Sequence, residues 1–204
     1  MAEKTKIAVF VSGGGTNLQA LIDAQASGII KSGEIVLVVS SSESAYALTR
    51  AKNAGIKGVT VSRKASASQE AFEAGILAEL EEAGAEMIVL AGFMSILSES
   101  FTSRFPRRIL NVHPSLIPSF CGKGFYGLRV HEAALDYGVK VTGATVHFVN
   151  EIPDGGEIIL QSAVNILEGD TPEILQKRVM EEAEWKILPL ATEKVAKELL
   201  DAKE

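Results

Sequence analysis

The sequence predicts an α/β protein with a doubly wound, mostly parallel twisted sheet and an antiparallel addition near the C-terminal half. Through the first half of the chain, short apolar runs alternate with segments of helical periodicity, which is typical of strand–helix–strand units. These runs are continuously apolar, as expected of strands whose two faces are both covered. In the second half, two strand-like runs follow one another without a helix between them, which indicates an antiparallel pair at one end of the sheet.

Strands are predicted where short apolar runs are rich in β-branched residues. In chain order they cover residues 7–11, 34–40, 58–61, 87–91, 109–112, 142–149 and 157–165. Right-handed crossovers between the earlier strands place them side by side in a parallel sheet. The last two strands are joined by the short segment 150–156, whose Pro153 and glycines favour a turn.

Helices are predicted between the strands from the spacing of their apolar residues. They cover residues 18–26, 45–54, 68–83 and 130–137, followed by a long tract from residue 171 to the C-terminus. Ser68 is a favourable N-cap, and Thr171 with Pro172 opens the last tract in the same way. Pro189 is expected to break or kink this tract, because proline lacks the N–H that an interior helical position donates.

The composition bounds the class of protein. With 204 residues, 47% of them apolar and 23% charged, the chain is expected to form a single domain, 1–204. Its 20 Lys and Arg against 26 Asp and Glu give a net charge of −6, which argues against a nucleic-acid partner. The lone Cys121 cannot form an internal disulfide and favours a reducing compartment. No apolar run reaches the ~18 residues of a membrane span and no secretory leader is evident, so a cytoplasmic protein without a membrane partner is expected.

A glycine-rich loop, Ser12-Gly-Gly-Gly-Thr-Asn17, follows the first predicted strand and precedes the first helix. The unpaired N–H groups at a helix N-terminus suit an anion, and glycines let the backbone approach it closely. The loop is not a P-loop, because no Gly-Lys-Ser/Thr follows. Phosphate binding at the C-terminal edge of the first strand is therefore predicted, with a simple strand-to-helix turn as the alternative.

Asn111 and His113 lie two residues apart at the end of the fifth strand, so their side chains are expected on the same face. Asp154 occupies the turn between the last two strands. An Asn amide and an imidazolium suit the stabilisation of an oxyanion, and a carboxylate beside the ring would raise its pKa and fix its tautomer. The three residues thus favour direct transfer of an acyl or formyl group to a nucleophile. The alternative is a turn residue beside a structural histidine.

Other reactive side chains give weaker signals. His131 on a predicted helix and His147 within a predicted strand are interpreted as structural. Cys121 lies in an irregular segment without an obvious base, so a catalytic thiol is not expected. The histidines lack a zinc-type spacing such as H-E-x-x-H, and no metal is predicted.

Four segments occur in an order that identifies a family. They are Ser12-Gly-Gly-Gly-Thr-Asn17, Leu90-Ala-Gly-Phe-Met-Ser-Ile-Leu97, Asn111-Val-His-Pro-Ser-Leu-Ile-Pro118, and Val146-His-Phe-Val149 with Asp154-Gly-Gly156. Together they resemble the phosphoribosylglycinamide formyltransferase family, folate-dependent enzymes of purine synthesis, over essentially the whole chain. The last two segments are specific for the formyltransferase superfamily, and the glycine loop and compact length narrow the resemblance to this family.

The resemblance implies transfer of the formyl group of 10-formyltetrahydrofolate, as cosubstrate, to the glycine amine of glycinamide ribonucleotide. It implies a nucleotide-binding half, 1–110, and a catalytic and folate-binding half, 111–204. The implied catalytic residues are Asn111, His113 and Asp154. The residues implied to bind glycinamide ribonucleotide are Gly13, Gly14, Gly15, Thr16, Asn17 and Glu184. The residues implied to bind folate are Gln69, Met94, Ser95, Ile96, Leu97, Asn111, Val149, Asn150 and Asp154.

Some positions depart from the family's pattern. Ser95 stands where some relatives have Arg, and Gln69 aligns with an Arg that meets the folate tail in some members. Arg63 and Lys64 are near enough in sequence to substitute for it. One extra residue precedes Glu184, which weakens its match to the acid that contacts the ribose.

Three other functions stay open. A methionyl-tRNA formyltransferase would use the same trio and donor, but it normally carries a C-terminal tRNA-binding domain, and the chain after Pro189 is short and the net charge is −6. A formyltetrahydrofolate hydrolase would use water as acceptor and usually has an extra N-terminal domain. A nucleotide-binding module without catalysis is disfavoured by the trio. Either a monomer or a homodimer is expected.

Overall fold

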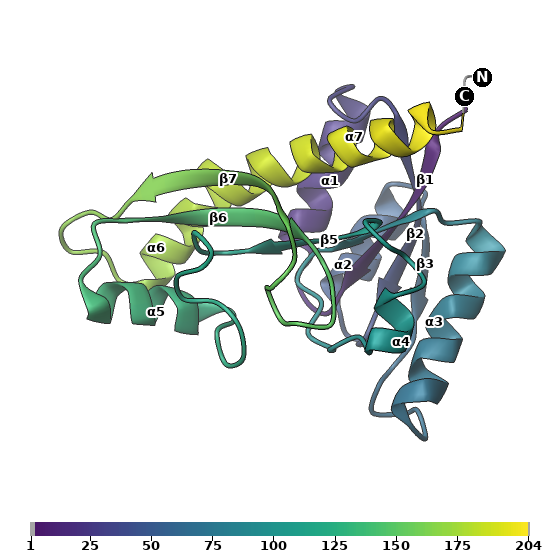
Figure 1. The fold of residues 1–204 in the computed structure, drawn as a ribbon, viewed down its shortest axis with the longest axis horizontal. Helices are drawn as coiled ribbons and strands as arrows, with labels where there is room; N and C mark the ends of the chain where they lie inside the picture. Colours follow the sequence, from purple (N-terminus) through teal and green to yellow (C-terminus); the bar gives the residue numbers. More distant parts are fainter. Residues whose placement is uncertain (1–2, 204) are drawn as a thin grey trace.

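The computed structural model describes residues 3–203, which form one seven-stranded sheet with helices on both faces (Figure 1). The strands are β1 (Thr5–Val11), β2 (Gly33–Ser40), β3 (Lys57–Thr60), β4 (Met87–Leu90), β5 (Ile109–His113), β6 (Val141–Phe148) and β7 (Ile158–Asn165). Their order is β3-β2-β1-β4-β5-β6-β7. The strands β1 to β5 are parallel, whereas β6 is antiparallel to β5 and β7 is antiparallel to β6. The predicted fold class is confirmed, including the antiparallel addition.

The helices begin and end close to the predicted residues. They are α1 (Thr16–Ala26), α2 (Tyr46–Asn53), α3 (Gln69–Ala83), α4 (Glu99–Thr102), α5 (Leu128–Tyr137), α6 (Pro172–Val179), the π-helical turn η1 (Met180–Glu184) and α7 (Trp185–Asp201). The predicted caps are confirmed, because Ser68 Oγ accepts the Ala71 N–H at 3.1 Å and Thr171 Oγ1 accepts the Ile174 N–H at 3.3 Å. The short helix α4 is absent from the sequence-based prediction, although its N-cap, Ser98, is a residue type that favours that position.

Two apolar cores lie on opposite sides of the sheet, because its central strands are buried on both faces. In β1, Ile7, Val9 and Val11 belong to the core shared with α1, α2, α6 and α7. The alternate residues Ala8 and Phe10 belong to the core shared with α3 and α4. Figure 1 shows α7 and α1 along one face and α3 and α4 on the other. Since helices cover both faces, the ends of the strands are the places where side chains can meet a ligand.

Of the break or kink expected at Pro189, the break is wrong, because α7 runs continuously through this residue. The missing N–H of Pro189 would have paired with the carbonyl of Trp185, the first residue of α7. That carbonyl directly follows η1, where the ladder of α-helical hydrogen bonds is already interrupted by a wider turn. The proline therefore falls at a junction that tolerates it.

The strand order reverses between β1 and β4, and this switch point positions the candidate site. The glycine loop follows β1, the segment 91–98 follows β4, and Asn111 and His113 end β5. Because these three strands are parallel neighbours, their carboxyl ends meet at one edge of the sheet, where open α/β sheets bind ligands. Among residues 3–203, no helix has the length and apolar character needed to span a bilayer.

Candidate active site

Two of the predicted catalytic side chains come from the end of β5. Asn111 and His113 are separated by a single residue, so the strand pleat directs both side chains to the same face. The pairing of β5 with β6 puts His147 opposite Asn111 and Thr145 opposite His113. Only 4% of His113 is exposed, so its ring is shielded from bulk water.

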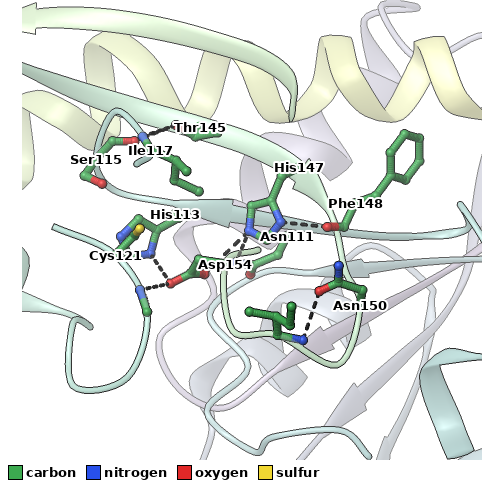
Figure 2. A network of polar contacts seen from close by, with 12 residues as sticks. Asn111, His113, Ser115, Ile117, Cys121, Thr145, His147, Phe148, Asn150 and Asp154 are labelled. Atoms are coloured by element: carbon green, nitrogen blue, oxygen red, sulfur yellow. Dashed lines mark hydrogen bonds and ion pairs between the residues drawn. The ribbon is translucent and has the colours of Figure 1, made fainter. Parts of the chain in front are cut away.

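Asp154 reaches these residues from the turn between β6 and β7 (Figure 2). A Cβ on Gly156 would lie 1.7 Å from the carbonyl oxygen of Phe148, so glycine is required for the turn to close this tightly against β6. The Asp154 carboxylate then stands between two imidazole rings. Its Oδ2 lies 3.4 Å from His113 Nδ1, and its Oδ1 lies 3.5 Å from His147 Nε2. The predicted trio is thus assembled in space.

His147 contacts two members of the trio, although sequence reasoning placed it among the structural histidines. Its Nδ1 lies 2.7 Å from the carbonyl oxygen of Phe148, so Nδ1 carries the hydrogen. Nε2 lies 3.5 Å from Asp154 Oδ1, to which it donates when the ring is protonated, and 3.2 Å from Asn111 Nδ2, from which it accepts when the ring is neutral. The contact orients the Asn111 amide and leaves its second N–H to donate elsewhere. The register of β6 against β5 puts His147 opposite Asn111, and knowledge of that register would have identified His147 as a site residue.

The irregular segment 119–127 lies directly against the trio. The carbonyl oxygen of Phe120 is 2.9 Å from His113 Nε2, and the N–H of Gly122 donates to Asp154 Oδ2 at 2.8 Å. Figure 2 shows this segment beside His113 and Asp154. Backbone groups of this segment therefore hydrogen-bond to a ring nitrogen of His113 and to a carboxylate oxygen of Asp154. No sequence pattern indicated this role.

Burial dominates the electrostatics of His113. Removal of the ring from water outweighs the favourable charge of Asp154 and the carbonyl of Phe120, so the pKa of His113 lies below its usual value of 6.5. The carboxylate acts in the predicted direction, but the expected net rise in the pKa of His113 is wrong. Burial also opposes ionisation of Asp154, yet hydrogen bonding to His147, the charge of His113 and the N–H of Gly122 together hold its pKa below the ordinary value of 3.8. Asp154 is therefore ionised at neutral pH, and His113 is protonated in a minority of molecules.

Two further ionisable residues, Cys121 and His131, lie near enough to the trio to feel its charges but do not share its chemistry. Burial raises the pKa of the Cys121 thiol, with the Asp154 charge acting in the same direction, and a nucleophilic thiolate needs the opposite. His131 is fully buried on α5, and burial lowers its pKa to about 4, so its ring is neutral. Neither ring nitrogen of His131 has a hydrogen-bond partner within residues 3–203. A structural role for His131 and a non-catalytic Cys121 stay predictions.

The glycine loop between β1 and α1 is held in place from α2. Gly15, the N-cap of α1, has a left-handed φ of 74°. The N–H of Ala47 donates to the Gly13 carbonyl at 3.1 Å, and Arg50 Nε donates to the Gly14 carbonyl at 2.9 Å. With both carbonyls engaged, the loop keeps one shape at a helix N-terminus that suits an anion. Like His147, Arg50 is a supporting residue that sequence reasoning missed, here for the glycine loop. No sequence pattern distinguishes it from other basic residues.

We expect Gly15→Ala to lower the free energy of unfolding by about 1–3 kcal/mol. The positive φ disfavours any side chain, and a Cβ on Gly15 would lie 2.6 Å from the Cβ of Ala47. Gly14→Ala is the matched control, because a Cβ there meets nothing within 4 Å. Urea unfolding followed by circular dichroism measures both variants. Equal stabilities would contradict the strained role of Gly15.

Glu184 meets Asn17 although the two residues are far apart in sequence. Asn17 Nδ2 donates to Glu184 Oε2 at 2.7 Å. Burial raises the pKa of Glu184 above its usual value, against the opposing effect of the Asn17 hydrogen bond. Glu184 is the last residue of η1, and a π turn accommodates an inserted residue within a helix. The extra residue noted before Glu184 is therefore absorbed locally, and the two residues implied for one substrate lie together.

The residues implied for folate binding line two adjoining cavities. The smaller, of about 130 Å³, has a lining that includes Ser95, Ile96, Leu97, Asn111, His147, Val149, Asn150 and Asp154. The wider groove, of about 1060 Å³, has a lining that includes Arg63, Lys64, Gln69, Met94, Ser95 and Ile96. Ser95 and Ile96 line both, so the cavities adjoin each other along the segment after β4.

Gln69 lies at the wider groove, but its amide already has protein partners. Its Nε2 donates to Glu73 Oε1 at 2.7 Å and to the Ile96 carbonyl at 3.0 Å. Its Oε1 accepts from Arg63 Nε at 2.9 Å. The amide supports the wall of the groove, and a direct contact between Gln69 and folate stays a prediction.

The assembled groups suit one type of chemistry. An amide N–H, an imidazole that can be protonated and an ionised carboxylate meet at the end of β5, and an anion-binding loop lies at the end of the neighbouring β1. Hydrogen-bond donors aimed at one point stabilise the negative charge that develops on an oxygen during acyl transfer. The carboxylate and the ring supply groups for proton movement.

The chain is similar to known proteins both in sequence and in structure. The sequence model described as formyl transferase matches residues 5–192. The chain is 43% identical over 185 residues to the phosphoribosylglycinamide formyltransferase of Haemophilus influenzae, covering 91% of this chain and 84% of that protein. It is 44% identical over 196 residues to the trifunctional purine biosynthetic protein adenosine-3 of Bos taurus, covering 95% of this chain but only 18% of that protein. The crystal structure of glycinamide ribonucleotide transformylase 1 from Symbiobacterium toebii matches with a TM-score of 0.89 at 42% identity, covering 97% of this chain and 90% of that one.

Proposed function

The chain belongs to the formyl transferase family, and from this premise we propose that it transfers the formyl group of 10-formyltetrahydrofolate to the glycine amine of glycinamide ribonucleotide. The products are formylglycinamide ribonucleotide and tetrahydrofolate, in de novo purine biosynthesis. The observation that carries the proposal is the meeting of the glycine loop, the segment after β4 and the trio Asn111, His113 and Asp154 at one switch point of the sheet. The other activities of the trifunctional relatives are not part of the proposal.

The acceptor is bound at the start of α1. Its phosphate lies against the loop residues Gly13–Asn17, where no acidic side chain occupies the first turn of the helix to compete for the N–H groups. Its ribose lies against Glu184, whose carboxylate is already positioned by Asn17. This places the glycine amine toward the trio at the neighbouring strand end.

The donor is bound along the segment after β4. The pterin ring enters the smaller cavity beside Asn111 and His147, and the rest of the molecule continues into the wider groove. Arg63 and Lys64 line that groove, and their positive charges suit the carboxylates of the glutamate tail. This arrangement supports the substitution of these two residues for the Arg that some relatives carry.

The reaction uses the trio as donors and as a proton relay. The neutral amine attacks the formyl carbon, and the N–H of Asn111 and the protonated ring of His113 donate to the oxygen that becomes negative. His113 Nε2 lies 2.9 Å from the carbonyl oxygen of Phe120 in the structure, so the proposed mechanism requires this carbonyl to give up the donor to the formyl oxygen when substrate binds. The bond from the formyl carbon to the folate nitrogen then breaks, this nitrogen gains a proton and the attacking amine loses one. Asp154 favours the charged form of His113 throughout.

We expect Gly14→Val to raise the KM for glycinamide ribonucleotide at least tenfold, on the order of the 1.4 kcal/mol carried by one lost phosphate contact. A Cβ on Gly14 meets no protein atom within 4 Å, so the fold tolerates the side chain while the space for the phosphate is reduced. The KM for 10-formyltetrahydrofolate is the internal control and should change little. Steady-state kinetics with each substrate varied in turn measure both constants, and equal changes in the two would remove the phosphate from this loop.

The direct test of the function is an assay of the purified protein with 10-formyltetrahydrofolate and three acceptors in parallel. We expect rapid formation of tetrahydrofolate with glycinamide ribonucleotide and only background rates with water or methionyl-tRNA. Turnover with water alone would favour a hydrolase, and formylation of the tRNA would favour the translational enzyme. No turnover with any acceptor would overturn the proposal in favour of a binding module.

A further inference from the structure

Glu73 is a buried acidic residue of α3 that the mechanism does not use. Only 5% of it is exposed. Its Oε1 accepts the Ser98 N–H at 2.6 Å and Gln69 Nε2 at 2.7 Å, and its Oε2 accepts the Ser98 hydroxyl at 2.5 Å. A buried carboxylate is costly unless hydrogen bonds compensate it, and these bonds to a charged acceptor are of the strong kind. The residue therefore ties α3 firmly to Ser98.

The chain held in this way is the segment 92–97 between β4 and α4, which belongs to no helix or strand. Side chains from elsewhere hold its backbone at several points. Ser12 Oγ accepts the Met94 N–H at 2.9 Å, and Gln69 Nε2 donates to the Ile96 carbonyl at 3.0 Å. Glu73 holds the end of the segment at Ser98, and it also positions the Gln69 amide that reaches Ile96. Glu73 thus holds the segment 92–97 directly at Ser98 and indirectly through Gln69.

This segment forms the wall common to the two cavities proposed for the formyl donor, through Ser95 and Ile96. Ile96 is 75% exposed, so its side chain is not fixed by packing in the core. Its position depends on the backbone, and the backbone depends on the hydrogen bonds from α3. A small displacement of the segment would alter both cavities together. The glycine loop touches the segment through the bond between Ser12 and Met94, but its carbonyls at Gly13 and Gly14 are held from α2.

We infer that Glu73 is a positioning residue for the formyl donor: its carboxylate, with Gln69, holds the segment 92–97 in the shape that receives the folate. The inference rests on the proposed function. Without these hydrogen bonds, donor binding must also restore the order of the segment, and that cost lowers the affinity for the donor. Affinity for glycinamide ribonucleotide changes much less, because the carbonyls of Gly13 and Gly14 in its loop are held from α2 and receive no hydrogen bond from the segment.

The decisive variant is Glu73→Met, which keeps an unbranched side chain of similar size but accepts no hydrogen bond. We expect the Kd for tetrahydrofolate and the KM for 10-formyltetrahydrofolate to rise about tenfold or more, as the loss of charge-assisted hydrogen bonds implies. The KM for glycinamide ribonucleotide should stay within about twofold. Glu73→Gln should restore most of the affinity, because its oxygen can accept the Ser98 N–H and its amino group can donate to the Ser98 hydroxyl.

Glu193→Met is the matched control. The Glu193 carboxylate accepts the N–H groups of Lys31 and Ser32 at 2.8 and 2.9 Å and the Ser32 hydroxyl at 2.9 Å, so the variant loses a similar set of bonds outside the cavities proposed for the donor. Calorimetric titration with tetrahydrofolate measures all variants, and urea unfolding compares their stabilities. If Glu73→Met does not fold, Ser98→Ala replaces it and should raise the same Kd about threefold, as for one lost hydrogen bond.

The outcomes separate the two proposals. Suppose that wild-type protein binds tetrahydrofolate and that Glu73→Met binds it as tightly as Glu193→Met does. That result would overturn the positioning role alone, and the same holds for Ser98→Ala where it replaces Glu73→Met. Equal rises in the KM values of both substrates would also overturn it, because that result indicates general destabilisation. Wild-type protein that does not bind tetrahydrofolate would overturn the proposed function and this inference with it.

Discussion

Asn111→Ala should lower kcat about 10²–10³-fold, the usual cost of removing one donor to a developing oxyanion. The amide of Asn111 is oriented by His147 at 3.2 Å, and its second N–H is the group proposed to meet the formyl oxygen. Asn111→Asp should be at least as damaging, because a carboxylate repels the forming negative charge and stands near Asp154 as well. The KM values should change much less than kcat, since the lost interaction strengthens in the transition state.

Rapid-mix single-turnover kinetics with saturating substrates measure the chemical step in these Asn111 variants. Asn53→Ala, at the exposed end of α2, is the control for an asparagine change outside the site. Retention of the circular dichroism spectrum and of tetrahydrofolate binding shows that the site is intact. Turnover within a few-fold of wild type in either variant would remove Asn111 from the reaction.

Asp154→Asn should lower kcat about 10²–10⁴-fold, the range associated with general acid–base groups. The substitution keeps the size of the side chain and an oxygen that can accept the Gly122 N–H, but it removes the charge beside His113. Burial lowers the pKa of His113 and Asp154 opposes this, so without the carboxylate burial acts alone and the pKa falls further. The imidazolium is then present only at lower pH, and the part of the pH–rate profile that reports His113 should move to lower pH.

Nuclear magnetic resonance of labelled imidazole rings tests the Asp154 variant directly. The chain has only three histidines, so single variants at His131 and His147 assign the spectrum. Asp136→Asn, on the exposed face of α5, is the control for loss of one acidic charge. A His113 titration that coincides with wild type, together with normal turnover, would make Asp154 a turn residue and would contradict the mechanism.

The fold was predictable to the extent that its signals are local. The continuous apolar run that forms β1 predicts a strand buried on both faces, and both cores use it. Ser68 and Thr171 cap their helices as predicted, because a cap depends on residues three positions apart. The break expected at Pro189 failed because the π turn before it changes the local helix geometry. The extra residue before Glu184 was a sign of an insertion, but it did not predict that a π turn would take it up.

The sequence by itself determined the parallel sheet, its antiparallel addition, and the strand ends that carry the glycine loop, Asn111 and His113, because periodicity and capping arise from residues that are near one another in the chain. Only the tertiary structure decided that His147 stands beside Asn111, that the backbone of 119–127 lies on the trio, and that Glu73 holds the segment after β4. Strand register and contacts between distant segments set these positions. The net direction of the His113 pKa belongs with them, because burial is a sum over the whole fold and here it exceeds the effect of one nearby carboxylate.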